Sequence, residues 1–164
     1  KRVINSLLQN IDVFAKNNIL IAATNHPEIL DKAIWRRFNT VIEIGSPQEN
    51  EIEELIKNFV DDFKTDFMND EKRKDRLVKL FEGKTPSDIK AIINNAKAHT
   101  IIHSSQTLSY EDVIIELYEF NNNGNITIEK LVEFLNENGV PQATIAERMK
   151  VSLRQIRNYL NKQA

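Results

Sequence analysis

The chain has 164 residues, of which 41% are hydrophobic and 28% are charged, and its formal net charge is −2. This is the composition of a soluble globular protein, and the sequence has no apolar run near the roughly 20 residues that a membrane span needs, so we expect no membrane partner. The absence of cysteine excludes disulfides and thiolate metal sites and fits a reducing, cytoplasmic compartment.

Residues that favour loops are scarce, with only four glycines and four prolines, so we expect a mostly α-helical fold. The sequence begins at Lys1, already inside a helix-like pattern, and we expect it to be a piece of a longer protein. Apolar residues recur at helical spacing from Val3 to Phe14 and predict an amphipathic helix over residues 2 to 14.

A continuous apolar run at residues 19–23 predicts a strand covered on both faces, as in a parallel sheet. A second short strand is expected at residues 41–44. Asn25 follows the first strand, at the edge where open parallel sheets bind ligands, and its amide suits contact with a water or a terminal phosphate. The alternative is that Asn25 caps the turn that leads into His26 and Pro27.

Four helices are expected between residues 46 and 120, a region called the lid below. The second should end at Gly83, the third near His103 and the fourth near Phe120. Capping signals mark the starts of the first, third and fourth helices, since a serine or threonine is followed by an acidic residue three positions later. These signals are Ser46-Pro47-Gln48-Glu49, Thr85-Pro86-Ser87-Asp88 and Ser109-Tyr110-Glu111-Asp112.

The polar stretch 121–125 predicts a linker, which places a domain boundary before residues 126–164, called the tail below. One amphipathic helix is expected over residues 128 to 136. The apolar spacing of residues 142–160 then resembles a helix-turn-helix of the phage-repressor kind, with Lys150 in place of the usual turn glycine.

The last two predicted helices of the tail are basic. Residues 142–164 contain five Lys or Arg and one Glu, net +4, against −6 for the remainder. This asymmetry is typical of a nucleic-acid module, so DNA is a candidate partner. Ser152 and Gln155 predict a capping box for the last helix. The residues expected to face DNA are Arg154, Gln155, Arg157 and Asn158. The alternative is a helical bundle that serves packing or protein contact.

Three segments in order, together with the start of the third lid helix, resemble the AAA ATPase family. The segments similar to its second region of homology are RVINSLLQNID at 2–12, AATNHP at 22–27 and LDKAIWRRF at 30–38, and TPSDIKAIINNA at 85–96 is similar to its lid. The resemblance implies residues 1–45 as the end of a P-loop α/β nucleotide domain, followed by a four-helix lid and the tail.

The resemblance also implies roles for individual residues. Asn25 stands at the sensor-1 position, and Arg36 and Arg37 stand in the arginine-finger segment, which acts on the nucleotide of a neighbouring subunit in a homo-oligomeric ring. Thr85, Pro86 and Ser87 stand where the lid meets the nucleotide. A delocalised guanidinium suits the charge of the phosphoryl-transfer transition state. The alternative is that the two arginines form salt bridges across a helix end.

The sequence departs from the family at several points. His26 stands where the family often has arginine, and no arginine occupies the sensor-2 place. The chain contains neither the G-x-x-x-x-G-K-[ST] loop nor an apolar run ending in Asp-Glu, so we expect no ATP hydrolysis by this piece alone. ATP and Mg²⁺ are the cofactors expected for the full-length parent only.

His99 and His103 lie four residues apart and could share a metal, but no third ligand is evident, so we expect no metal site. The function implied is that of a ring ATPase that couples ATP turnover to remodelling of a protein or nucleic-acid partner. A non-enzymatic DNA-binding or adaptor protein with a vestigial AAA region is the alternative.

Overall fold

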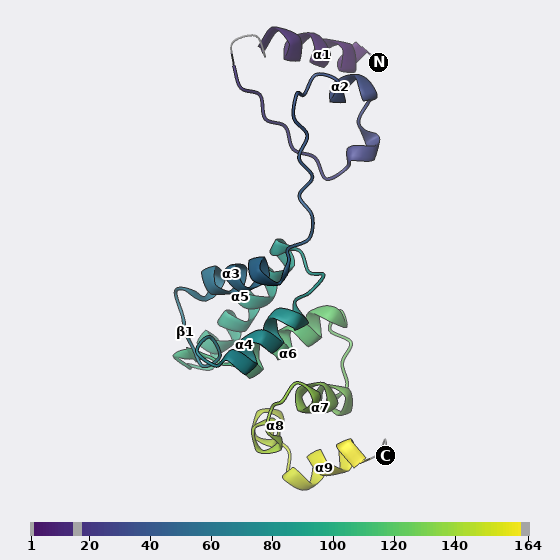
Figure 1. Ribbon diagram of the computed structural model, residues 1–164. Coiled ribbons are helices and arrows are strands. Elements are labelled where there is room, and N and C mark those ends of the chain that lie inside the picture. The colour runs from purple at the N-terminus through teal and green to yellow at the C-terminus, as the bar shows by residue number, and fades with distance from the viewer. Residues whose placement is uncertain (1, 15–17, 162–164) are drawn as a thin grey trace. The chain divides into compact units, whose positions relative to one another are not determined.

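The structure is a computed structural model that describes residues 2–14 and 18–161. Its packing divides the chain into two units, residues 1–45 and residues 46–164. Helices dominate the described secondary structure, which confirms the mostly α-helical fold class (Figure 1). Among the described residues, no helix is both long and apolar enough to cross a membrane.

The first unit contains the predicted N-terminal helix, α1 (Arg2–Phe14), which confirms that element. The side chains of residues 2–5, 7 and 12 lie outside the described part, and Leu8 is buried. A short 3₁₀ helix, η1 (Pro27–Ile29), and a single helical turn, α2 (Lys32–Trp35), follow.

The two strands predicted in this unit are wrong. Residues 19–23 and 41–44 have neither helical nor strand structure, and Ile19 and Ile44 are 89% and 91% exposed. A parallel strand is stable only when neighbouring strands accept and donate its ladder hydrogen bonds. In the described chain the only strands are two-residue segments of the second unit, so these apolar runs have no sheet to join.

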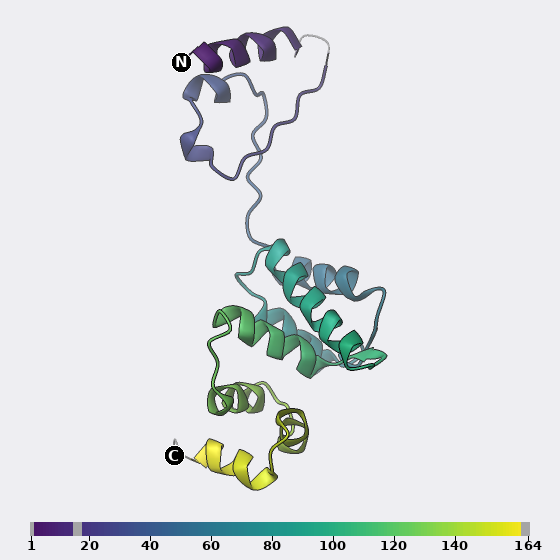
Figure 2. The ribbon, with the colours of Figure 1, turned by 180° about the vertical axis from the view of Figure 1, so that it is seen from behind.

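The lid occupies the first part of the second unit. Its elements are α3 (Glu49–Val60), β1 (Lys64–Thr65), α4 (Glu71–Leu80), α5 (Pro86–Ile102), β2 (Thr107–Leu108) and α6 (Tyr110–Asn121). α3 packs against α4 and α5, and α5 packs against α6 (Figure 2). The two short strands pair in parallel, with Lys64 opposite Thr107 and Thr65 opposite Leu108, and they join the loop after α3 to the loop before α6.

Two of the three predicted capping signals in the lid are confirmed. Thr85 and Ser109 each form a reciprocal capping box with the acidic residue three positions later. The prediction at Ser46 is wrong by two residues, because the cap of α3 is Gln48, whose backbone N–H donates to Glu51 Oε2 at 2.8 Å. Glutamine and glutamate satisfy the same two orphan amides that a serine box would satisfy.

The tail folds as α7 (Ile128–Glu137), α8 (Gln142–Met149) and α9 (Leu153–Asn161). Lys150 ends α8 in the left-handed conformation, with φ of 55°, at the position where glycine is usual. The predicted capping box of α9 is confirmed, since Gln155 Oε1 accepts from the Ser152 backbone N–H at 2.9 Å. Each of the three helices buries at least one apolar side chain in the cluster that also forms the core of the lid.

The segment 121–125 lies inside the second unit. α6 continues to Asn121, and Asn123 and Gly124 then turn the chain with positive φ angles of 50° and 70°. α6 packs directly against α7 beyond this turn. The lid and the tail therefore share one core across the segment that we predicted as a linker.

Candidate functional site

The two arginines of the predicted finger segment lie on the turn that ends α2. Asp31 caps the start of this short helix, and its Oδ1 accepts from the Ala33 backbone N–H at 2.8 Å. Arg36 is the C-terminal cap residue and is exposed. Arg37 is half-buried, and its Nη1 donates to the Ala33 carbonyl oxygen at 2.8 Å. The turn therefore holds one guanidinium against the helix and presents the other to solvent.

Asn25, the predicted phosphate sensor, lies in an exposed bend before η1. The turn around it is fixed by its neighbours, because Thr24 Oγ1 accepts from the His26 backbone N–H at 3.0 Å and His26 Nδ1 lies 3.1 Å from Glu28 Oε1. Because the predicted strand is not formed, Asn25 does not stand at a sheet edge. None of the described hydrogen bonds joins Asn25 to Arg36.

Thr85, Pro86 and Ser87 open α5 and are all exposed. The Asp88 carboxylate fills the end of this helix, since its Oδ2 accepts from the Thr85 backbone N–H at 3.1 Å and from the Thr85 hydroxyl at 2.8 Å. These hydrogen bonds from Thr85 hold the pKa of Asp88 below its usual value. A helix N-terminus attracts anions, but here a carboxylate already occupies that position.

The four residues expected to contact DNA all lie on α9 and are all exposed. Ile156 in the same helix is fully buried, and at about 100° per residue Arg154 lies on the opposite face. The structure thus brings Arg154, Arg157 and Asn158 together on one solvent-facing side. The side-chain oxygen of Gln155 already accepts a hydrogen bond from the Ser152 hydroxyl in the capping box.

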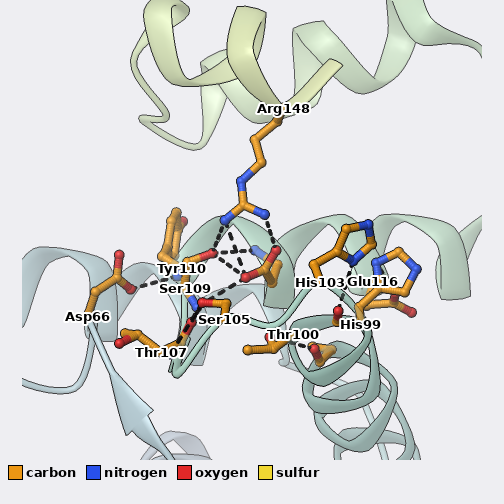
Figure 3. Close-up of polar contacts among 12 residues, drawn as sticks. Asp66, His99, Thr100, His103, Ser105, Thr107, Ser109, Tyr110, Glu116 and Arg148 are labelled. Atoms are coloured by element: carbon orange, nitrogen blue, oxygen red, sulfur yellow. Dashed lines mark hydrogen bonds and ion pairs between the residues drawn. The ribbon is translucent and has the colours of Figure 1, made fainter. Parts of the chain in front are cut away.

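Another basic residue of the tail has a different role, which the sequence did not reveal. Arg148, near the end of α8, reaches the start of α6 in the lid, where Nη1 donates to Asp112 Oδ1 at 2.6 Å and Nη2 donates to Ser109 Oγ at 2.8 Å (Figure 3). These partners lie 36 and 39 residues away along the chain. No local pattern could have predicted the contact. Lys162, which also counts in the tail's charge, lies outside the described residues.

Tyr110, beside this contact, is almost completely buried. Its hydroxyl donates to the Asn138 carbonyl oxygen of the tail at 3.1 Å, and its backbone N–H donates to Asp66 Oδ1 at 2.7 Å. Burial raises the pKa of Tyr110 to about 12 despite the nearby Arg76 and Arg73. The phenol therefore stays neutral at any physiological pH.

The histidine pair lies on the exposed side of α5. The rings of His99 and His103 are 5.4 Å apart, and His99 Nδ1 lies 4.0 Å from Glu116 Oε1. Burial raises the pKa of the Glu116 carboxyl, with a further contribution from Glu119. Within the described ranges, no group of three or more His, Cys, Asp or Glu side chains is arranged to hold a metal ion.

Comparison with known proteins extends the resemblance. Residues 1–46 match the family described as "ATPase family associated with various cellular activities (AAA)". The chain is 31% identical over 117 residues to the ATP-dependent zinc metalloprotease FtsH of Clostridium perfringens, covering 69% of this chain and 16% of that protein.

Two archaeal proteins are similar over a comparable length. A putative 26S proteasome regulatory subunit homolog of Methanothermobacter thermautotrophicus is 33% identical over 122 residues, covering 71% of this chain and 32% of that protein. The proteasome-activating nucleotidase of Methanococcus maripaludis is 33% identical over 116 residues, covering 68% and 28%. The chain thus spans about a sixth to a third of the length of these relatives.

Proposed function

Because this chain belongs to the AAA family of ATPases, we propose that it is part of a ring-forming protein that couples ATP hydrolysis to remodelling of a protein or nucleic-acid partner. In this proposal residues 1–45 complete the α/β nucleotide domain, residues 46–120 form the lid, and residues 126–164 form a helix-turn-helix bundle that packs on the lid beyond the turn at 121–125. A cytoplasmic location is part of the proposal and fits a sequence without cysteine.

The observation that carries this proposal is the placement of the arginine pair. A group that acts on a neighbour's nucleotide has to project from its own subunit, and Arg36 is the exposed member of the pair. Arg37, whose Nη1 donates to the Ala33 carbonyl, holds the turn on which Arg36 stands. We therefore assign Arg36 as the finger and Arg37 as a positioning residue. The guanidinium would stabilise charge on the transferring phosphoryl group.

Asn25 and the start of α5 complete the proposed nucleotide contacts. Asn25 would orient the attacking water in the full-length parent. Thr85, Pro86 and Ser87 would contact an uncharged part of the nucleotide, because the Asp88 carboxylate beside them would repel a phosphate. The loop that binds phosphates and Mg²⁺ in this family is not in this sequence, so we assign no step through the metal and expect no ATPase activity from residues 1–164 alone.

The test is substitution in the full-length parent. Arg36→Ala should lower the rate of hydrolysis by about 10³-fold or more while nucleotide binding is retained, because the finger acts in the transition state. Lys32→Ala, on the same short helix, is the matched control and should change the rate less than about threefold. Mixing the Arg36→Ala subunit with a phosphate-loop mutant should restore activity in trans. Full activity of both Arg36→Ala and Arg37→Ala would overturn the proposal.

A second candidate function, DNA binding without enzymatic activity, is favoured by the exposed basic face of α9. Arg154 and Arg157 lie on that face, and Lys150 stands at the turn before it. A single module of this kind should bind duplex DNA non-specifically with a dissociation constant of about 10⁻⁴ to 10⁻⁶ M.

Titration of residues 1–164 with mixed duplexes at low salt tests this function. Replacing Arg154 and Arg157 by alanine should weaken binding and reduce its salt dependence by about one to two units of slope. Replacing Lys57 and Lys79, two exposed lysines of the lid, removes the same charge and should have a smaller effect. Absence of binding at roughly 100 µM would exclude the DNA function and leave α9 as a surface for protein contact.

A further inference from the structure

Arg148 of α8 joins the tail to the lid through what we call the latch, formed by Arg148, Ser109 and Asp112. The guanidinium donates to both carboxylate oxygens of Asp112, at 2.6 and 3.3 Å, and to the Ser109 hydroxyl oxygen at 2.8 Å. Figure 3 shows Arg148 extending from its helix toward Ser109. Such a forked, charge-assisted contact fixes orientation as well as distance.

The partner of Arg148 is already an ordered structure, because Ser109 and Asp112 form the capping box of α6. The Ser109 hydroxyl donates to Asp112 Oδ2 at 2.6 Å and accepts from the Asp112 backbone N–H at 3.1 Å. With the bond from Arg148, this hydroxyl uses its one donor and both acceptor positions. The Asp112 side chain is 10% exposed and the Arg148 side chain 41% exposed, so only the carboxylate is shielded from water. A bidentate arginine–carboxylate geometry is one in which a partly exposed ion pair still contributes to stability.

Both helix ends favour the charges of the latch. Asp112 lies in the first turn of α6 and Arg148 in the last turn of α8. A negative charge is stabilised at the start of a helix and a positive charge at its end. The capping box, the ion pair and the two helix dipoles therefore all stabilise the contact between α6 and α8.

A second polar contact and a shared core accompany the latch. Tyr110, next to Ser109, donates its hydroxyl proton to the Asn138 carbonyl oxygen that follows α7. The apolar residues of the tail that are buried in the same cluster as the lid core are Leu131, Val132, Leu135, Val140, Ile145, Ala146 and Ile156. The tail is thus attached to α6 at two polar points and along an apolar face.

We propose that the lid and the tail move as one rigid body, with the capping box of α6 as the docking site that fixes the orientation of the tail. This goes beyond the proposed ATPase function and rests on it only for the source of movement. If nucleotide turnover rotates the lid, α9 and its basic face turn with it. The capping box then has two roles, because it starts α6 and receives Arg148.

Measurements on residues 1–164 without nucleotide test this proposal, so its failure is distinct from failure of the ATPase function. Backbone ¹⁵N relaxation should give one rotational correlation time for amides of residues 46–120 and 126–161. Arg148→Ala should raise the opening equilibrium of α7–α9, measured by hydrogen exchange, about tenfold, equivalent to about 1.4 kcal/mol. Arg154→Ala, in the same tail but on the exposed face of α9, should change it less than twofold.

Arg148→Lys distinguishes the forked geometry from charge alone, because lysine keeps the charge and loses the fork. Its opening equilibrium should rise by more than that of Arg154→Ala and by less than that of Arg148→Ala. Two separate correlation times in the unsubstituted chain, or equal exchange in Arg148→Ala and Arg154→Ala, would overturn the proposal.

Discussion

Gly139→Ala should destabilise the second unit through two separate effects. Gly139 connects α7 to α8 with φ of +81°, a conformation that residues with a side chain rarely adopt. A β-carbon built at this position would lie 1.8 Å from Arg76 Nη1 and 3.0 Å from its Cζ. The substitution therefore strains the backbone and displaces a guanidinium.

The two costs can be estimated separately. Placing alanine at a positive φ costs about 1 to 2 kcal/mol. Arg76 is a flexible side chain, so its end can move, but it then leaves its place beside the Tyr110 phenol. Losing an interaction of that kind costs about 1 kcal/mol. We expect the free energy of unfolding to fall by about 2 to 3 kcal/mol.

Urea unfolding followed by far-UV circular dichroism measures this loss. With a slope of about 1 to 3 kcal/mol per molar urea, the midpoint should fall by roughly 1 M. Gly124→Ala is the matched control, since Gly124 has φ of +70° and nothing within 4 Å of a built β-carbon. Equal losses in the two variants would refute the role of Arg76, and a loss below about 0.5 kcal/mol at Gly139 would refute the backbone argument.

Two further predictions concern pH. Burial raises the pKa of Glu116 above the value of 4.5 that it has in the unfolded chain, so ionisation of this carboxyl destabilises the fold as the pH rises through the folded pKa. Glu116→Gln should therefore be more stable than the unsubstituted protein at pH 7, with a difference that disappears below about pH 4. A destabilised Glu116→Gln at pH 7 would contradict this. The pKa of Tyr110 is raised from 10.0 to about 12, so its contribution to stability is complete below pH 10 and is lost between pH 10 and 12. Between pH 10 and 12 the free energy of unfolding should therefore fall by up to about 3 kcal/mol less in Tyr110→Phe than in the unsubstituted protein. Identical pH profiles for the two proteins would show that the Tyr110 phenol does not cause the fall.

The elements that local sequence determines were predictable. Thr85, Ser109 and Ser152 each mark a helix start by a capping box that spans only four residues, and all three boxes are present. Ser46 failed as a cap because a second, equivalent pair formed by Gln48 and Glu51 lies two residues further on. Several good caps in succession cannot be ranked from sequence alone.

What depends on distant parts of the chain was not predictable. The apolar run 19–23 has the composition of a buried strand, but strand formation needs hydrogen-bonding neighbours that composition cannot supply. Likewise, Arg148 contributes to a simple count of positive charge in the tail, while its partner Asp112 lies 36 residues away in another helix. The roles of Asn25 and Arg36 rest on resemblance and stay proposals, because Asn25 would act on a bound nucleotide and Arg36 on the nucleotide of a neighbouring subunit.

The core shared by lid and tail has a consequence for synthesis of the protein. Tyr118 of α6 packs against Phe134 of α7 in a tilted arrangement, with ring centroids 4.7 Å apart, and the Tyr110 hydroxyl donates to the Asn138 carbonyl oxygen. A ribosome adds about 5 to 20 residues per second, so roughly 2 to 8 s separate α6 from the end of α9. During that interval the face of α6 that later packs against the tail is exposed to solvent. A chain that ends near residue 125 would therefore display apolar surface, the kind of surface on which aggregation begins and which chaperones cover.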